Sequence, residues 1–219
     1  MSPHAAVTAT VGDELLERAR DLALQPQRMV LGITGAPAAG KSTLAATVAE
    51  SVGESVVVPM DGFHLHDAEL GRLGLADRKG APETFDVAGY LAMLRRVRTE
   101  VDRTVYAPEF DRSQEQSIAG AIAIRPSHRL VITEGNYLLY DAPGWSDVLP
   151  LLDETWFLEG DDRARQDRLV RRHVEHGRTP DAARRWVSVT DQPNAEIVGR
   201  TRKVADVLVS FDDRPAARP

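Results

Sequence analysis

The chain of 219 residues contains no cysteine, which excludes disulfide bonds, zinc ribbons and catalysis by a thiol. It has no apolar run long enough to span a bilayer, and its first ten residues lack the basic start and continuous apolar stretch of a signal peptide. We therefore expect a cytoplasmic protein that does not enter a membrane.

Lysine is scarce, because only three of the 27 basic side chains are lysines, at positions 41, 79 and 203. The net charge of −6 argues against a general nucleic-acid-binding protein. Hydrophobic residues (42%) and charged residues (27%) are at the levels of globular proteins. The length suits one α/β domain, so we expect residues 1–219 to form a single unit.

One segment carries most of the functional information. Gly35–Ser42 fits the pattern G-x-x-x-x-G-K-[ST], between the apolar run Met29–Ile33 and a helix-forming stretch that begins at Thr43. In that strand-to-helix setting the pattern predicts a loop that binds a nucleoside triphosphate. Lys41 would reach the β- and γ-phosphates, and the hydroxyl of Ser42 would bind Mg²⁺.

The other loop residues would contribute through their backbone. Gly35 and Gly40 can adopt positive φ and leave no Cβ near the phosphate oxygens. Pro37 has no N–H, so the donors should come from the residues that follow it. These predicted donors are Ala38, Ala39, Gly40, Lys41, Ser42 and Thr43. A plain glycine turn is the alternative, but it would not require Lys-Ser after the second glycine.

Strand-like and helix-like segments alternate along the chain, which predicts a mostly parallel five-stranded core sheet covered on both faces. The expected strands are 28–34, 55–60, 129–134, 154–158 and 204–209. The expected helices are 12–24, 42–51, a short one at 68–73, 86–98, 161–176 and 180–190. Residues 1–27 would hold an N-terminal helix, 28–211 the core, 161–190 a helical lid, and 212–219 a frayed tail.

Two acidic residues follow predicted strands. Asp61 comes directly after the second, and Glu134 ends the third. Ligands of parallel sheets bind beyond the carboxyl ends of the strands, so both should lie beside the phosphate loop. Phosphoryl transfer needs a group that orients the attacking hydroxyl and acids that organise Mg²⁺. We expect Asp61 to act on the attacking hydroxyl and Glu134 to hold Mg²⁺ through bound water. A turn residue or helix cap is the alternative for either.

The predicted lid is rich in arginine. Residues 163–185 hold eight arginines against three acids, and Arg165, Arg168 and Arg172 share one helical face with Arg171 beside it. Guanidinium groups on such a helix could close over the γ-phosphate and stabilise transition-state charge. We expect Arg168 to act in catalysis and Arg171 and Arg178 to bind phosphate. A solvated helix face is the alternative for at least half of the arginines.

With these residues in place, the chain resembles the phosphoribulokinase, uridine kinase and pantothenate kinase group. Pro59–His64 is similar to the segment with the catalytic aspartate, Val131–Gly135 to the strand with the second acid, and Arg168–Arg178 to the lid. Residues 201–208 resemble the closing strand of uridine kinases. The resemblance implies the P-loop NTPase three-layer fold, ATP and Mg²⁺. His176 replaces one lid arginine.

Within this group the chain resembles bacterial proteins named as fructose transport system kinases or nucleoside kinase-like proteins. Their signature segments look like Arg78–Asp86 and Tyr106–Arg112. By analogy these segments line the acceptor pocket. The implied acceptor contacts are Asp61, His64, Lys79, Asp111 and Arg112.

We therefore expect an ATP-dependent kinase that phosphorylates a hydroxyl of a nucleoside, a pantothenate-like alcohol or a sugar. A homodimer is the candidate assembly. A GTPase switch is the second class, but the sequence has no N-K-x-D for guanine. A nucleotide-binding regulatory partner of a sugar transporter, without turnover, is the third.

Overall fold

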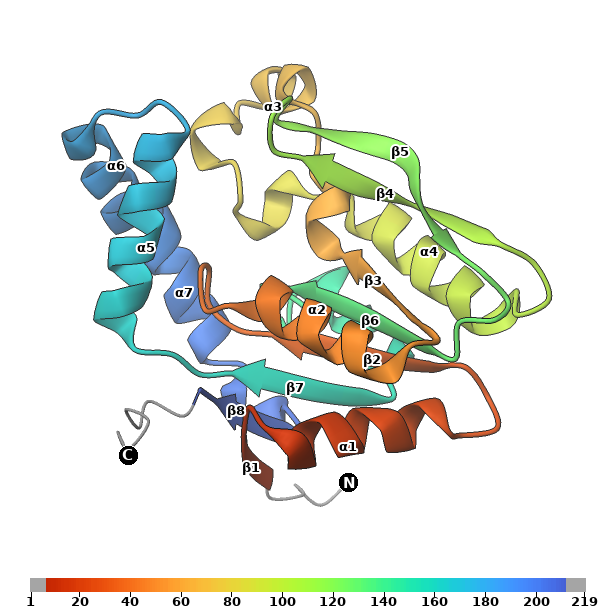
Figure 1. Cartoon of the computed structure of the whole chain (residues 1–219). Helices are drawn as coiled ribbons and strands as arrows, with labels where there is room; N and C mark the ends of the chain where they lie inside the picture. The colour runs from red at the N-terminus through yellow and green to blue at the C-terminus, as the bar shows by residue number, and fades with distance from the viewer. Residues whose placement is uncertain (1–6, 212–219) are drawn as a thin grey trace, which may run out of the picture.

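The computed structural model describes residues 7–211 of the chain. A six-stranded parallel sheet forms its centre, in the order β1-β8-β7-β2-β6-β3 (Figure 1). The strands are β1 (Val7–Thr10), β2 (Met29–Thr34), β3 (Ser55–Pro59), β6 (Leu130–Gly135), β7 (Glu154–Leu158) and β8 (Val207–Ser210). The predicted three-layer α/β fold is thus confirmed.

Alternate side chains of the strands enter two separate cores, because successive residues of a strand point to opposite faces. Leu31 and Ile33 of β2 pack under α1 (Asp13–Ala23) and α2 (Lys41–Val52). Val30, which precedes Leu31 and points to the opposite face, packs there with α4 (Val87–Thr99) and α7 (Gln192–Gly199). All six residues of β2 are buried, as expected for a strand covered on both sides.

The prediction of five strands was wrong by one. Val7–Thr10, expected to belong to a helical N-terminal segment, pairs with β8 from Val7↔Val207 to Thr10↔Ser210. A four-residue strand is too short for its alternation to be recognised in the sequence. The last strand also begins later than expected, since Arg202–Val204 forms a 3₁₀ turn before it. The tail expected at 212–219 lies outside the described residues.

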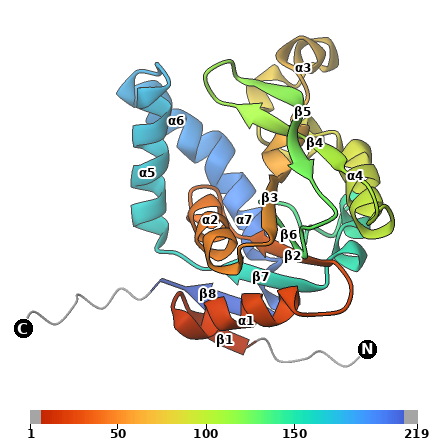
Figure 2. The same ribbon diagram turned by 45° about the vertical axis from the view of Figure 1, so that its right-hand side comes forward.

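A two-stranded antiparallel hairpin, β4 (Val105–Asp111) and β5 (Gln116–Ile124), was not predicted. It stands over the carboxyl end of β3 and next to α3 (Asp67–Leu73), as Figure 2 shows. The backbone of β4 approaches Gly62 closely, and a Cβ on Gly62 would lie 2.3 Å from the carbonyl oxygen of Pro108. Glycine at this position therefore lets the hairpin pack onto the turn that carries Asp61.

The lid consists of α5 (Asp162–Glu175), α6 (Pro180–Trp186) and a π-helical turn, Val187–Asp191, which leads into α7. Asp161 and Thr179 cap the first two helices by accepting hydrogen bonds from Ala164 and Ala182. The helix expected at 180–190 is helical throughout, but it changes from α-helical to π-helical after Trp186. No helix within residues 7–211 combines the length and apolarity needed to cross a bilayer.

Candidate active site

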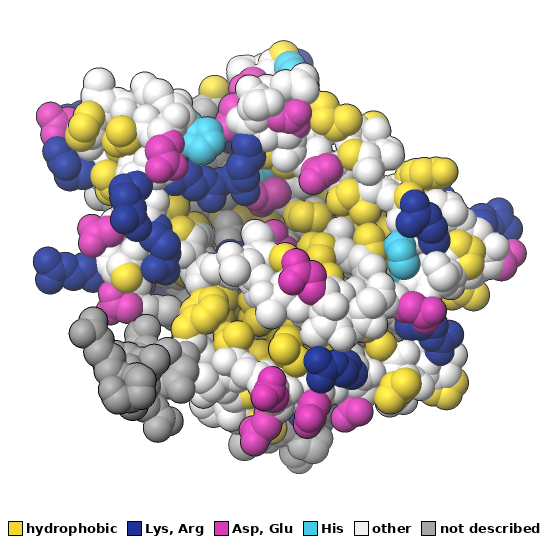
Figure 3. Space-filling model, in the orientation of Figure 1, with side chains coloured by type: hydrophobic (Ala, Val, Ile, Leu, Met, Phe, Trp, Pro, Cys, Tyr) yellow, Lys and Arg dark blue, Asp and Glu magenta, His cyan; other side chains and the backbone are white. Residues whose placement is uncertain are grey.

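A cleft of about 1270 Å³ opens above the carboxyl ends of the central strands. The lid helices α5 and α6 form one wall, and the β4–β5 hairpin with α3 forms the other (Figures 1 and 2). Figure 3 shows basic and acidic side chains gathered around this hollow. The phosphate loop lies at the bottom of the cleft, with Pro37, Ala38, Gly40, Lys41, Ser42 and Thr43 among the lining residues.

The backbone of the loop is held in an unusual conformation. Ala38 (φ 62°) and Gly40 (φ 107°) lie in the left-handed region. The amides of residues 41–43 begin α2, so they have no acceptor within the helix and can bind an anion at its positive end. The amide of Ala39 instead donates to the carbonyl of Ala36, so Ala39 is not free to serve as the predicted phosphate donor.

The carbonyl oxygens of the loop are held by basic side chains. Those of Gly35 and Ala36 accept from Nζ of Lys41 at 3.0 Å each. Further along the loop, Pro37 accepts from Arg165 and Ala38 from Nε of Arg168, at 3.5 and 3.0 Å. Arg168, predicted to act on the transferred phosphoryl group, thus lines the cleft but also holds the phosphate loop.

The predicted metal pair lies together. Oγ of Ser42 donates to Oε1 of Glu134 over 2.8 Å. Burial is the main cause that raises the pKa of Glu134, and the nearby Asp61 carboxylate raises it further. Mg²⁺ prefers oxygen ligands and keeps several waters, so a hydroxyl and a carboxylate at the rim of an open cleft fit it.

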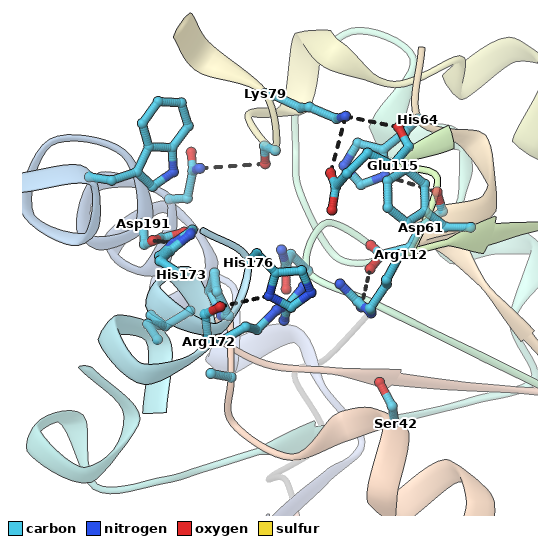
Figure 4. Close-up of a pocket in the computed structure, with 18 of the residues that line it drawn as sticks. Ser42, Asp61, His64, Lys79, Arg112, Glu115, Arg172, His173, His176 and Asp191 are labelled. Carbon is cyan, nitrogen blue, oxygen red and sulfur yellow. Dashed lines mark hydrogen bonds and ion pairs between the residues drawn. The ribbon is translucent and has the colours of Figure 1, made fainter. Parts of the chain in front are cut away.

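Asp61 lies on the same side of the cleft, in the 3₁₀ turn Met60–Phe63 that follows β3. Its Oδ2 accepts a hydrogen bond from Arg112 at 3.1 Å, an ion pair between the turn and the hairpin tip. Figure 4 shows this pair facing Arg172 and His176 of the lid, with Ser42 below. The structure therefore places Asp61 beside the predicted acceptor contact Arg112.

His64 and Lys79 complete this wall. The ring of His64 packs against Phe85 and Phe110, with centroids 4.0 and 4.9 Å apart, and burial lowers its pKa. Nζ of Lys79 pairs with Asp67 at 2.7 Å and with Glu115 at 3.3 Å. These contacts join α3, the loop after it and the hairpin around one space.

Asp111 does not line the cleft. Its carboxylate accepts hydrogen bonds from Ser113 and Gln114, which lower its pKa to about 2. The structure thus places this predicted acceptor contact in the hairpin turn, where it stabilises the β4–β5 connection.

The lid arginines occupy different positions. Arg172 and Arg178 line the cleft, whereas Arg171 is exposed and does not. Arg172 and Arg112 both face the cleft (Figure 4), and desolvation, followed by repulsion from Arg112, lowers the pKa of Arg172. Arg178 stacks on the Trp186 ring, 3.9 Å from its centroid.

Four further cleft residues were not predicted from the sequence: Glu115, Asn136, Trp186 and Asp191. Trp186 lines the cleft, where Arg178 stacks on its ring. Asn136 comes two residues after Glu134, directly after the strand. Its position at a strand end is the sequence feature that could have predicted its place in the cleft. The carboxylate of Asp191 accepts a hydrogen bond from Nε2 of His173 at 2.8 Å, and the spacing of these two residues in the sequence does not predict this contact.

No protein-family model matches the chain. It is 34% identical over 209 residues to "Putative uridine kinase C227.14" of Schizosaccharomyces pombe, which covers 90% of this chain and 89% of that protein. It is 37% identical over 159 residues to "ATP-dependent kinase-like protein notR'" of Aspergillus versicolor, over 68% of this chain and 92% of that protein.

A similar solved structure is that of a "putative fructose transport system kinase" from Silicibacter sp. TM1040. It superposes with a TM-score of 0.81 at 38% identity and covers 90% of this chain and 99% of that one. The first and the third of these similarities each cover 90% of the chain. The chain belongs to the uridine kinase-like family of P-loop kinases, and it is an ATP-dependent kinase.

Proposed function

We propose that this kinase transfers the γ-phosphoryl group of ATP to a hydroxyl of a small polar metabolite, with Asp61 as the base. The observation that carries the proposal is one cleft in which a phosphate loop, a hydroxyl–carboxylate pair and a second carboxylate meet. A regulatory protein that only binds nucleotide would need the loop but not Asp61 at the acceptor wall.

The donor triphosphate would bind the free amides that begin α2, with Lys41 at its β- and γ-phosphates. Ser42 and Glu134 would hold Mg²⁺, which when bound neutralises developing charge on the phosphates. Arg172 and Arg178, which line the lid wall, would stabilise the charge that spreads over the transferred group. Arg168 would act less directly, through the carbonyl of Ala38.

On the acceptor side, one oxygen of Asp61 would accept the proton of the attacking hydroxyl. The hydroxyl oxygen would then bond to the γ-phosphorus while the bond to the ADP oxygen breaks. Arg112 would hold the other carboxylate oxygen and fix the orientation of the base. Arg112 would thus keep Asp61 in place without a direct contact from the lid.

The acceptor itself would fill the space bordered by His64, Lys79, Phe110 and Arg112. The names of the two relatives mention uridine and a fructose transport system, and both nucleosides and sugars offer hydroxyl groups. Pantothenate-like alcohols stay a third class. The homodimer expected from the sequence stays a prediction.

The test is a panel of nucleosides, sugars and hydroxy acids, scored by acceptor-dependent ADP release. One compound or class should raise ADP release sharply, and Asp61→Asn should remove that response while ATP binding remains. A flat response over the panel would favour the regulatory alternative. An Asp61→Asn variant with wild-type turnover would remove Asp61 from the mechanism.

A further inference from the structure

Asn136 lies at the base of the cleft, directly after β6, and its side chain reaches the phosphate-loop lysine. The distance from its Oδ1 to Nζ of Lys41 is 2.7 Å. Its backbone carbonyl accepts a hydrogen bond from Oγ1 of Thr34, 3.2 Å away at the end of β2. Two neighbouring strand ends therefore fix the position of this residue.

The atom that faces the lysine is defined by chemistry. An ammonium group has only donors, so the amide must present its oxygen rather than its NH₂ to Lys41. The three donors of Lys41 are matched by three neutral oxygens, those of Gly35, Ala36 and Asn136. Within residues 7–211, Lys41 forms no ion pair at 4 Å or less.

Neutral partners have a consequence for binding an anion. A carboxylate in direct contact with Lys41 would neutralise the charge that the donor phosphates need, and it would add a third negative group beside Asp61 and Glu134. An amide oxygen can orient the ammonium by a hydrogen bond without cancelling its charge. The side chain at position 136 therefore has the length of aspartate but not its charge.

We propose that Asn136 is a positioning residue that holds Lys41 beside the phosphate loop and keeps its charge available to the donor phosphates. This inference rests on the proposed function, because it assumes that Lys41 binds a triphosphate during turnover. Asn136 acts through Lys41 and need not touch the acceptor. Its loss should therefore affect donor binding and kcat, and should leave the KM of the acceptor unchanged.

The experiment compares Asn136→Ala with the isosteric Asn136→Asp, using the full chain. Calorimetry with ATP and Mg²⁺ needs no acceptor, so it tests this inference even if the acceptor panel fails. We expect Asn136→Asp to weaken donor binding by at least about tenfold, and Asn136→Ala to weaken it less. Once an acceptor is known, Asn136→Ala should lower kcat about tenfold at an unchanged acceptor KM.

A measurement without donor checks the positioning itself. Protein labelled with ¹³C-lysine gives side-chain signals from three lysines only, and Lys→Arg variants assign them. The Lys41 methylene protons next to Nζ should be inequivalent in the wild type and averaged in Asn136→Ala. Gln27→Ala, which removes an amide at the opposite end of β2, is the matched control.

The inference is overturned if both Asn136 variants bind ATP as the wild type does. It is also overturned if the Lys41 signals do not change in Asn136→Ala. Equal weakening by Ala and Asp would contradict the argument from charge. Thermal unfolding of each variant separates these outcomes from loss of the fold.

Discussion

The donor half and the acceptor half of the cleft are built in different ways. On the donor side, residues 35–43 form one continuous loop and helix start, which Glu134, Asn136, Arg165 and Arg168 contact from other parts of the chain. On the acceptor side, the turn with Asp61, the loop with Lys79 and the hairpin with Arg112 and Glu115 are three separate segments that meet through ion pairs. The first half is a local structure, and the second exists only because distant segments pack together.

The comparison teaches where substrate choice can change. A loop whose carbonyls are held by Lys41, Arg165 and Arg168 leaves little freedom for its amides. The acceptor wall depends on a hairpin that a family member could lengthen, shorten or recharge without altering the phosphate loop. This difference is consistent with a family whose members use ATP and whose names mention different acceptors.

The largest effect should come from the donor side. Lys41→Ala removes the single ammonium at the predicted β- and γ-phosphates, and turnover should fall by about 10²–10³-fold or more. Acceptor-dependent ADP release measures it, and thermal unfolding shows whether the fold is kept. The exposed Lys203→Ala is the matched control. Turnover within a few-fold of wild type would refute the assignment of Lys41.

Breaking the acceptor side should be selective. Arg112→Ala removes the guanidinium that holds Oδ2 of Asp61, and we expect the acceptor KM to rise about tenfold. The Kd of ATP, measured by calorimetry, should be unchanged. Arg103→Ala, an exposed arginine paired with its neighbour Asp102, is the control. A parallel loss of ATP binding would mean that the two halves are not independent.

Glu134→Gln should separate stability from function. Burial raises the pKa of Glu134, so wild-type stability is fully present below the ordinary carboxyl pKa and is lost as pH rises through the raised one. The glutamine variant cannot lose that stability, and its Tm at neutral pH should be higher. Its response to Mg²⁺ should be much weaker. A wild-type Tm that does not fall over this pH range would contradict the argument.

The smallest effect should come from Asp111, whose carboxylate is engaged in the hairpin turn. Asp111→Asn should change the acceptor KM less than about threefold. The same assay that shows the Arg112 effect measures it, so the two variants form a pair on one hairpin. If Asp111→Asn raised the acceptor KM as much as Arg112→Ala does, Asp111 would have to contact the acceptor.

Much of the fold was predictable because mostly apolar segments must be buried, so they can be recognised in the sequence as core strands and helices. β2, β3, β6 and β7 are mostly apolar, and α4 shows apolar residues at helical spacing over its 13 residues. The short β1 and the hairpin lack such signals. In β5, Gln116–Ile124, the middle residues are exposed and small, so alternation is absent even though the strand has nine residues.

The sequence by itself determined the phosphate loop, the strand-end acids and the helical lid, since each depends on residues close together in the chain. Only the tertiary structure decided that Arg112 reaches Asp61, that Asp111 is not among the residues lining the cleft and that Asn136 holds Lys41. Arg112 and Asp61 are 51 residues apart in the sequence, and Asn136 and Lys41 are 95 residues apart. Asp111 and Gln114 are only 3 residues apart. Even the contact between Asp111 and Gln114 could not be predicted without knowing that these residues form a hairpin turn. Side-chain direction depends on backbone geometry and on packing against distant segments, and spacing alone specifies neither.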